Sequence, residues 1–112
     1  GLAEAMENIF ILYYQVFISA EIKKHANTIL DHLLKKKLIL GGPILEGPAK
    51  FWWKGKIVKM NYAYIFSYTI ETLKQRVMAE CKIVSAEEVP MISFVPFEGN
   101  SELIKIIDET LI

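Results

Sequence analysis

The sequence predicts an α+β fold with the element order β-α-β-β-α-β, a long β-hairpin at its centre and a short C-terminal helix. Apolar residues recur at helical spacing in two segments, near 20–37 and from Glu71 onward. Segments rich in β-branched and aromatic residues flank each of them. A turn signal, "KGK", joins two such segments in the middle of the chain. This order is typical of the ferredoxin-like arrangement, an antiparallel sheet with both helices on one face.

The first strand is predicted over residues 9–18, which show no clean polar–apolar alternation, a pattern that favours burial on both faces. A helix is expected over 20–37, with Ser19 as its N-terminal cap. The lysines at 35–37 suit the negative end of the helix dipole and indicate a solvated helix end. The apolar stripe of this helix comprises Ile22, Ala26, Ile29, Leu30, Leu33 and Leu34.

Residues 38–50 are strand-like but are interrupted by "GGP" and "EGP". Because Pro43 and Pro48 cannot donate ladder hydrogen bonds, this strand must be bulged, bent or at a sheet edge. Gly55 supplies the positive φ that a tight turn needs. The partner strand is expected over 57–69, with "YAYIFSY" at its centre, and the two strands form the long hairpin.

The second helix is expected to begin near Glu71 and to bury Leu73, Val77, Cys81 and Val84. Pro90 opens the last long strand, "MISFVPF". After a turn at "GN", Ser101 is expected to cap the C-terminal helix, with Glu102 in its first turn.

Trp52 and Trp53 stand side by side in the hairpin, so they point to opposite faces of a strand. The fold leaves one face of its sheet without helices, and water is a poor partner for an aromatic patch. We therefore expect both tryptophans to mark a subunit interface of an oligomer. Of the two, Trp52 is expected to face the subunit's own core and Trp53 to pack against another subunit.

Composition limits the classes of partner. The chain has 112 residues, 53% of them hydrophobic, with 13 basic and 13 acidic side chains. This balance argues against nucleic acid or an anionic membrane as a partner held by bulk charge. Residues 1–5 precede Met6 and are interpreted as a cloning remnant, and 6–112 as a single domain. The one cysteine, Cys81, excludes an internal disulfide, which fits a cytoplasmic location.

Candidate metal ligands and catalytic groups are few. His25 and His32 are seven positions apart on one helix, so they lie about 10.5 Å apart along its axis, too far to share an ion. Cys81 lies on an apolar stripe and is interpreted as core. Glu87 and Glu88 could hold a cation or act as acid and base, but a solvated loop before a strand is the favoured interpretation.

Several motifs resemble the CutA divalent-cation-tolerance family over residues 6–112. They are "FWWKGKI" in the hairpin, "EVP" before the last strand, and "VPFEGNSELIKII" at the C-terminus. The resemblance implies a ferredoxin-like subunit in a homotrimer with strands paired across subunits. It also implies a link to the tolerance of copper and other divalent metal ions, with no enzymatic reaction.

The sequence departs from the family pattern where a metal ligand is expected. The family's His-Pro-Tyr before Glu-Val-Pro is replaced by Ser85, Ala86 and Glu87, so its histidine is absent, and Glu88 remains as a weak candidate ligand. No cofactor is expected beyond a weakly held divalent cation, copper or zinc. The alternative is a small-molecule-sensing trimer resembling nitrogen-regulatory proteins, with its ligand in an inter-subunit cleft. An acylphosphatase-like enzyme is disfavoured, because the single arginine, Arg76, lies on a helix.

Overall fold

The computed structural model describes residues 12–87 and 89–112 of the chain. The predicted remnant at 1–5, the start of the first predicted strand and Glu88 therefore lie outside the described residues. The predicted element order and the C-terminal helix are confirmed. The elements are β1 (Tyr13–Glu21), α2 (Lys23–Lys35), β2 (Ile44–Trp53), β3 (Lys56–Ile70), η1 (Glu71–Leu73), α3 (Lys74–Val84), β4 (Ile92–Pro96) and α4 (Ser101–Leu111).

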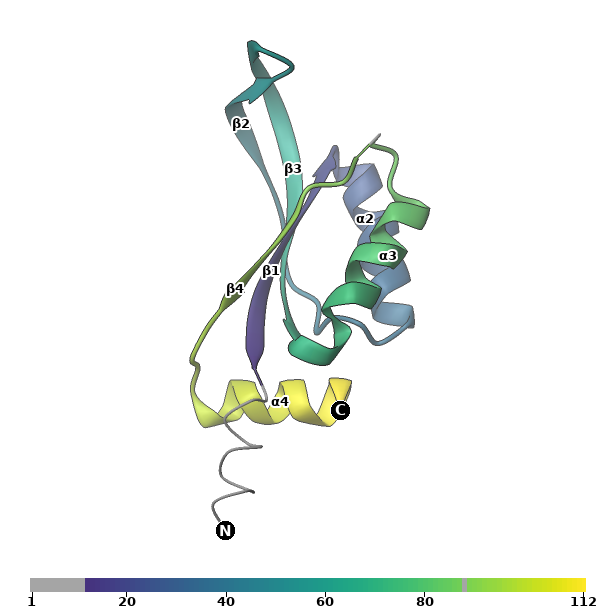
Figure 1. The fold of residues 1–112 in the computed structure, drawn as a ribbon, viewed down its shortest axis with the longest axis vertical. Coiled ribbons are helices and arrows are strands. Elements are labelled where there is room, and N and C mark those ends of the chain that lie inside the picture. The colour runs from purple at the N-terminus through teal and green to yellow at the C-terminus, as the bar shows by residue number, and fades with distance from the viewer. Residues whose placement is uncertain (1–11, 88) are drawn as a thin grey trace.

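The strands form one antiparallel sheet in the order β2-β3-β1-β4. Helices α2 and α3 both lie against one face of this sheet, as predicted (Figure 1). Helix α4 lies across the end of the sheet where β1 begins, and the β2–β3 hairpin extends past the helices at the opposite end (Figure 1). The Tyr13 hydroxyl of β1 donates a 2.7 Å hydrogen bond to Asp108 Oδ1, which ties α4 to the sheet.

The core lies between the sheet and the two helices. Along β1 every second side chain is buried, and Val16 and Ile18 are completely inaccessible to solvent. On α2 the buried positions are Ala26, Ile29 and Leu33, which recur at the i, i+3, i+7 spacing of one helix face. Val77 and Cys81 complete the contact from α3. The helical periodicity read from the sequence therefore identified the centre of the covered face, but two predicted members of the stripe are wrong, since Ile22 lies before α2 and is 44% exposed and Leu34 is 40% exposed.

The opposite face of the sheet carries a row of aromatic side chains, here called the aromatic face. Neighbouring rings touch along it, with centroids 5.0 Å apart for Phe17 and Phe66 and 5.1 Å apart for Tyr68 and Phe97. Its members are Tyr13, Phe17, Tyr64, Phe66, Tyr68 and Phe97. The rings are half-buried by one another, except that Tyr64 is 37% exposed. The predicted burial of both faces of β1 is thus complete on one face and partial on the other.

The hairpin turn follows the predicted chemistry. Both turn residues have positive φ, 49° at Lys54 and 78° at Gly55, as a two-residue type I′ turn requires. The strands pair without a break from Ile44 opposite Ile65 to Trp53 opposite Lys56. Pro48 is accommodated because β2 is an edge strand, as the sequence indicated.

The segment 38–43 is not part of a strand, contrary to the prediction of a strand over 38–50. Side-chain hydroxyls of β3 hold it instead. Thr69 Oγ1 donates to the Leu38 carbonyl at 2.8 Å, and Ser67 Oγ accepts from the Gly41 amide at 2.9 Å. Both hydroxyls are fully buried, so these bonds also satisfy polar groups in the core. The backbone passes so close to β3 that only a glycine fits at position 42.

Two predicted helix caps are wrong. Ser19 lies inside β1, and α2 begins at Lys23 after Ile22, whose side chain cannot cap it. Asn100, not Ser101, caps α4, and its Oδ1 accepts a 3.0 Å hydrogen bond from the Leu103 amide. Glu102 does lie in the first turn of α4, as predicted.

A small ion-pair network joins the two covering helices. Glu80 of α3 contacts Lys36 Nζ at 2.8 Å and His32 Nε2 at 3.0 Å. The pKa of the Glu80 carboxyl is lowered below its ordinary value. The main cause is the hydrogen bond from Lys36, and the second is the hydrogen bond from His32. The prediction that the lysines at 35–37 form only a solvated helix end is therefore wrong for Lys36, whose ion pair with Glu80 links the end of α2 to α3.

We expect Gly42→Ala to destabilise the fold by about 2 kcal/mol or more, because a Cβ there would lie 2.2 Å from the Phe66 carbonyl oxygen. Gly47→Ala is the matched control in the same edge region, since no atom lies within 4 Å of its added Cβ. Urea unfolding should show a change of no more than about 0.5 kcal/mol for this control. Equal stability of the two variants would contradict the close approach.

The Glu80 network should stabilise the protein only at pH values where the carboxyl is ionised. Because the folded-state pKa of Glu80 is lowered, its contribution is present above the ordinary glutamate pKa of about 4.3 and is lost as the pH falls through the folded value. Melting temperatures of the wild type and Glu80→Gln should therefore differ at pH 7 and converge toward pH 3. A difference that stays constant over this range would show that the charge is not the cause.

Candidate functional site

The loop between α3 and β4 brings Glu87 against the sheet, where two hydroxyls hold it. Tyr62 of β3 donates to Glu87 Oε1 at 2.7 Å, and Ser19 of β1 donates to Glu87 Oε2 at 3.1 Å. Each carboxylate oxygen thus accepts one hydrogen bond from a different strand. We call these three residues the Glu87 cluster. It lies at the end of the sheet from which the hairpin extends.

Local backbone features place these side chains. The pairing of β1 with β3 shifts between Ser19 and Glu21, where Glu21 adopts a φ of 71°. Ser19 also fixes the start of the last strand, because its amide donates to the Met91 carbonyl and its Oγ accepts from the Met91 amide, both at 2.9 Å. After α3 ends, Ser85 Oγ accepts a 3.1 Å bond from the Glu87 amide, which turns the loop toward the sheet.

The Tyr62 hydroxyl is held in its protonated form. Burial is the largest cause that raises the pKa of Tyr62, and the hydrogen bond with Ser19 opposes it. Together with the hydrogen bond to Glu87 and the charge of that carboxylate, the result is a pKa of about 12. The phenol therefore remains a hydrogen-bond donor to Glu87 throughout the physiological pH range. It is not poised as a general base at neutral pH.

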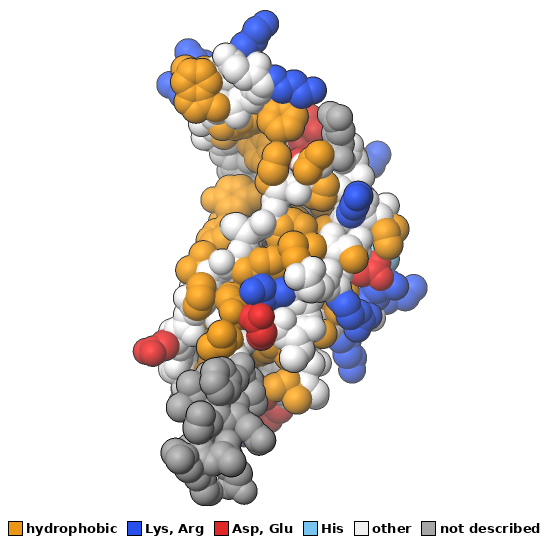
Figure 2. Space-filling model, viewed as in Figure 1, with side chains coloured by type: hydrophobic (Ala, Val, Ile, Leu, Met, Phe, Trp, Pro, Cys, Tyr) orange, Lys and Arg blue, Asp and Glu red, His pale blue; other side chains and the backbone are white. Residues whose placement is uncertain are grey.

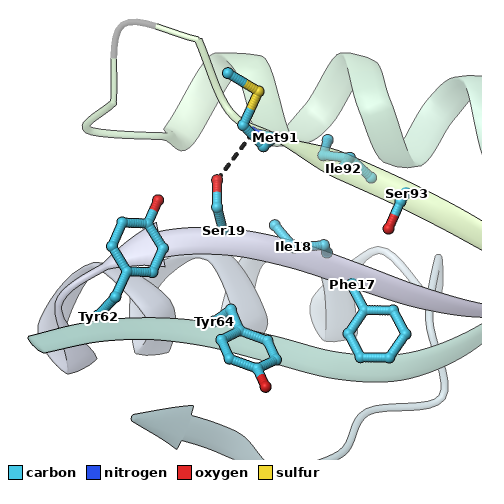
Figure 3. A pocket seen from close by; sticks show the side chains of 8 residues that line it. All are labelled: Phe17, Ile18, Ser19, Tyr62, Tyr64, Met91, Ile92 and Ser93. Carbon is cyan, nitrogen blue, oxygen red and sulfur yellow. Dashed lines mark hydrogen bonds between the residues drawn. The ribbon is translucent and has the colours of Figure 1, made fainter. Parts of the chain in front are cut away.

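A shallow hollow of about 510 Å³ opens beside the cluster (Figure 3). Rings from the aromatic face line one side, and the Phe17 and Tyr64 centroids lie 6.2 Å apart. Met91 and Ser93 of the β4 segment line the other side (Figure 3). A second cavity, of about 260 Å³, adjoins the cluster on the hairpin side. The polar groups are thus set between two apolar hollows.

The histidines do not form a metal site. His32 is engaged with Glu80, and His25 Nδ1 is buried with no hydrogen-bond partner among the described residues. In the parts of the chain that the structure describes, no group of three or more His, Cys, Asp or Glu side chains converges on one point. Zinc and copper sites normally need three or four such ligands. The described residues of the chain therefore do not fit a resident metal centre.

Cys81 is a core residue, as predicted. Its side chain is completely buried in the cluster between α2, α3 and the sheet. Burial, and to a lesser extent the charge of Glu80, raise the pKa of the Cys81 thiol to about 12. A thiol with this pKa is neither a nucleophile nor a ready metal ligand at neutral pH.

The interpretation of Glu87 as part of a solvated loop is wrong. Its side chain is half-buried. The carboxylate is hydrogen-bonded to Tyr62, which lies 25 positions earlier in the chain, and to Ser19, which lies 68 positions earlier. No local pattern in the sequence could have revealed contacts over such separations. The adjacent candidate, Glu88, lies outside the described residues and remains a prediction.

The two tryptophans lie on opposite faces of β2, as predicted, since Trp52 pairs with Ile57 and Trp53 with Lys56. The expectation that Trp52 fills the subunit's own core is wrong, because its side chain is 72% exposed. The reason is the length of the hairpin, whose tip extends past the covering helices (Figure 1). Trp52 lies close to this tip, one residue before the last pair of the ladder. Trp53 is 39% exposed and lines the smaller cavity.

Comparison with known proteins gives a consistent result. The family model described as CutA1 divalent ion tolerance protein matches residues 14–110. A divalent-cation tolerance protein CutA from Archaeoglobus fulgidus is 32% identical over 100 residues, which cover 86% of this chain and 95% of that protein.

Solved structures agree with these sequence matches. A structure of CutA from A. fulgidus superposes with a TM-score of 0.82 at 29% identity, covering 88% of this chain and 98% of that one. A CutA structure from Pyrococcus horikoshii has a TM-score of 0.81 over 88% of this chain and 98% of its own, and at 24% identity it supports the fold alone. The chain therefore belongs to the CutA1 family of divalent ion tolerance proteins.

Proposed function

We propose that the protein contributes to the tolerance of divalent metal ions, copper among them, as a homotrimer that catalyses no reaction. The match of the CutA1 family model to residues 14–110 is the observation that carries this proposal. The relatives described above are named for divalent-cation tolerance, which favours this function over a nitrogen-regulatory type of small-molecule sensor.

The proposed role does not depend on a tightly held metal ion. The described residues of one subunit offer no three-ligand site, and Ser85 stands where the family pattern has histidine. Two hydroxyls donate to the carboxylate oxygens of the half-buried Glu87, which makes this carboxylate a weaker ligand for a metal ion. Binding of copper or zinc is therefore proposed to be weak and reversible.

The aromatic face supports the proposed trimer. Large apolar side chains remain exposed on it and along the hairpin, including Leu45 at 39% and Val95 at 45%. Figure 2 shows hydrophobic side chains running from the hairpin along the strands. Contiguous apolar surface of this kind marks protein interfaces in soluble proteins.

Because Trp52 is the more exposed of the two tryptophans, we propose it as the stronger interface anchor and Trp53 as a lesser contributor.

We also propose a cytoplasmic location, which the single unpaired cysteine, Cys81, supports. One relative, from A. fulgidus, is called a periplasmic protein, so fractionation of the native host is the relevant test. No helix in the described residues has the length and hydrophobicity needed to cross a membrane.

The trimer proposal predicts a mass of three times 12.8 kDa by light scattering coupled to size exclusion, at low micromolar concentration. Trp52→Ala should weaken association by about 2 kcal/mol or more per contact, because it removes an aromatic anchor. The melting temperature of this variant should then rise with protein concentration. Ile83→Ala is the matched control, since Ile83 is also 72% exposed but lies on the helix layer. A 12.8 kDa species for the wild type would overturn the proposal.

The metal-tolerance proposal is tested in the host and in vitro. Deleting the gene should make growth more sensitive to copper, and wild-type protein should restore tolerance while Trp52→Ala should not. Calorimetry at neutral pH should show dissociation constants above about 1 μM for copper(II) and zinc, because no three strong ligands converge among residues 12–87 and 89–112. A tight site with one ion per subunit that Glu88→Ala removes would contradict the weak-binding proposal. Unchanged copper sensitivity would contradict the function itself.

A further inference from the structure

We propose that the 260 Å³ cavity between the hairpin and the α3–β4 loop binds a small organic ammonium ion. Three aromatic side chains, Phe51, Trp53 and Tyr62, line it from the hairpin. Two carboxylates, Glu21 and Glu87, line it from the end of β1 and from the loop. This combination of aromatic walls and negative charge is the chemistry that recognises alkylated ammonium groups.

The hairpin register brings the aromatic walls together. Phe51 and Trp53 lie two residues apart on β2 and so share one face, and Phe51 pairs with Val58 of β3. Phe51 and Tyr62 pack edge to face, with centroids 5.5 Å apart and planes at 76°. Edge-to-face packing fixes the rings and leaves π surface available for a cation.

Trp53 already binds one ammonium group of the chain itself. Lys54 Nζ lies 5.6 Å from the centroid of the Trp53 ring, within the range of a cation–π interaction. The Trp53 ring is 39% exposed in the single chain and lines the cavity, so a ligand in the cavity contacts it directly. A tryptophan is the strongest of the aromatic side chains in this role.

The carboxylates facing the cavity lack a positive partner within residues 12–87 and 89–112. No ion pair of the described residues involves Glu21 or Glu87. The donors to Glu87 are the hydroxyls of Tyr62 and Ser19, which carry no charge. Each carboxylate oxygen has a second lone pair, so Glu87 can accept from a ligand while keeping both bonds.

The cavity suits an organic cation better than a metal ion or an anion. Val58, Met60 and Val89 contribute much of the remaining lining, and such apolar groups cannot replace the oxygen ligands of a hydrated metal. The two carboxylates disfavour an anion. An alkylammonium group presents both an apolar shell and a positive charge. The volume lies just below the range of about 300–1,000 Å³ for drug-sized ligands, so the ligand must be small.

The test uses the full chain in its natural assembly state, with ¹⁵N-labelled protein and choline as the probe. The indole signal of Trp53, assigned from its loss in Trp53→Phe, should shift saturably as choline is added. The neutral isostere 3,3-dimethylbutan-1-ol has the same shape without the charge and should produce no saturable shift. A shift of equal size and affinity with the isostere, or no shift with choline, would overturn the proposal.

Charge variants at the cavity complete the test. Glu21→Gln with Glu87→Gln should weaken choline binding about tenfold or more, because the ligand loses two carboxylates. Glu98→Gln with Glu109→Gln changes the net charge equally, at exposed positions outside the cavity, and should leave affinity unchanged. The single variant Glu21→Gln avoids the Glu87 hydrogen bonds, so its loss of affinity separates a ligand contact from a folding defect. Unchanged affinity in both cavity variants would overturn the proposal, as would equal loss in the control pair.

Discussion

The packing of α2 and α3 against one face of a four-stranded sheet leaves the other face to the side chains of the strands themselves. Aliphatic residues such as Val16 and Ile18 fill the covered face, where dense packing with the helices excludes water. The uncovered face receives aromatic rings, which shield one another only in part. The chain therefore buries its apolar side chains on one face of the sheet and leaves apolar surface on the other, and the proposed trimer would bury that surface through the same hydrophobic driving force.

The Glu87 cluster joins three parts of the chain by hydrogen bonds. Ser19 holds the beginning of β4 through Met91 and also holds the loop through Glu87, while Tyr62 connects that loop to the hairpin. Loss of the negative charge of Glu87 would weaken the hydrogen bonds that the loop makes with Ser19 and Tyr62. The two hollows on either side of the cluster share one wall, since Tyr62 borders both of them.

Features that depend on local sequence were predictable, and features that depend on distant contacts were not. The apolar spacing of α2 and the "KGK" turn placed the helix face and the hairpin correctly, because propensity and periodicity act over a few residues. The predicted cap of α2 is wrong because Ser19 is held in the sheet by a partner 72 positions away. The cap of α4 was misplaced by one position, since Asn100 and Ser101 are both good capping residues. The exposure of Trp52 and the hydrogen bonds of Glu87 depend on where the helices end relative to the hairpin. No short sequence motif encodes the position of the helix ends relative to the hairpin.

The state of Cys81 has a practical consequence for thiol chemistry. The only cysteine of the chain is fully buried, and its thiol has a pKa raised to about 12, so the folded protein presents no thiolate to alkylating reagents at neutral pH. A cysteine introduced at an exposed position such as Lys50 would then react selectively without removal of the native one. Fluorophores or spin labels attached there would test the proposed association of chains while the native cysteine stays in place. The same burial makes alkylation of Cys81 a sensitive reporter of global unfolding.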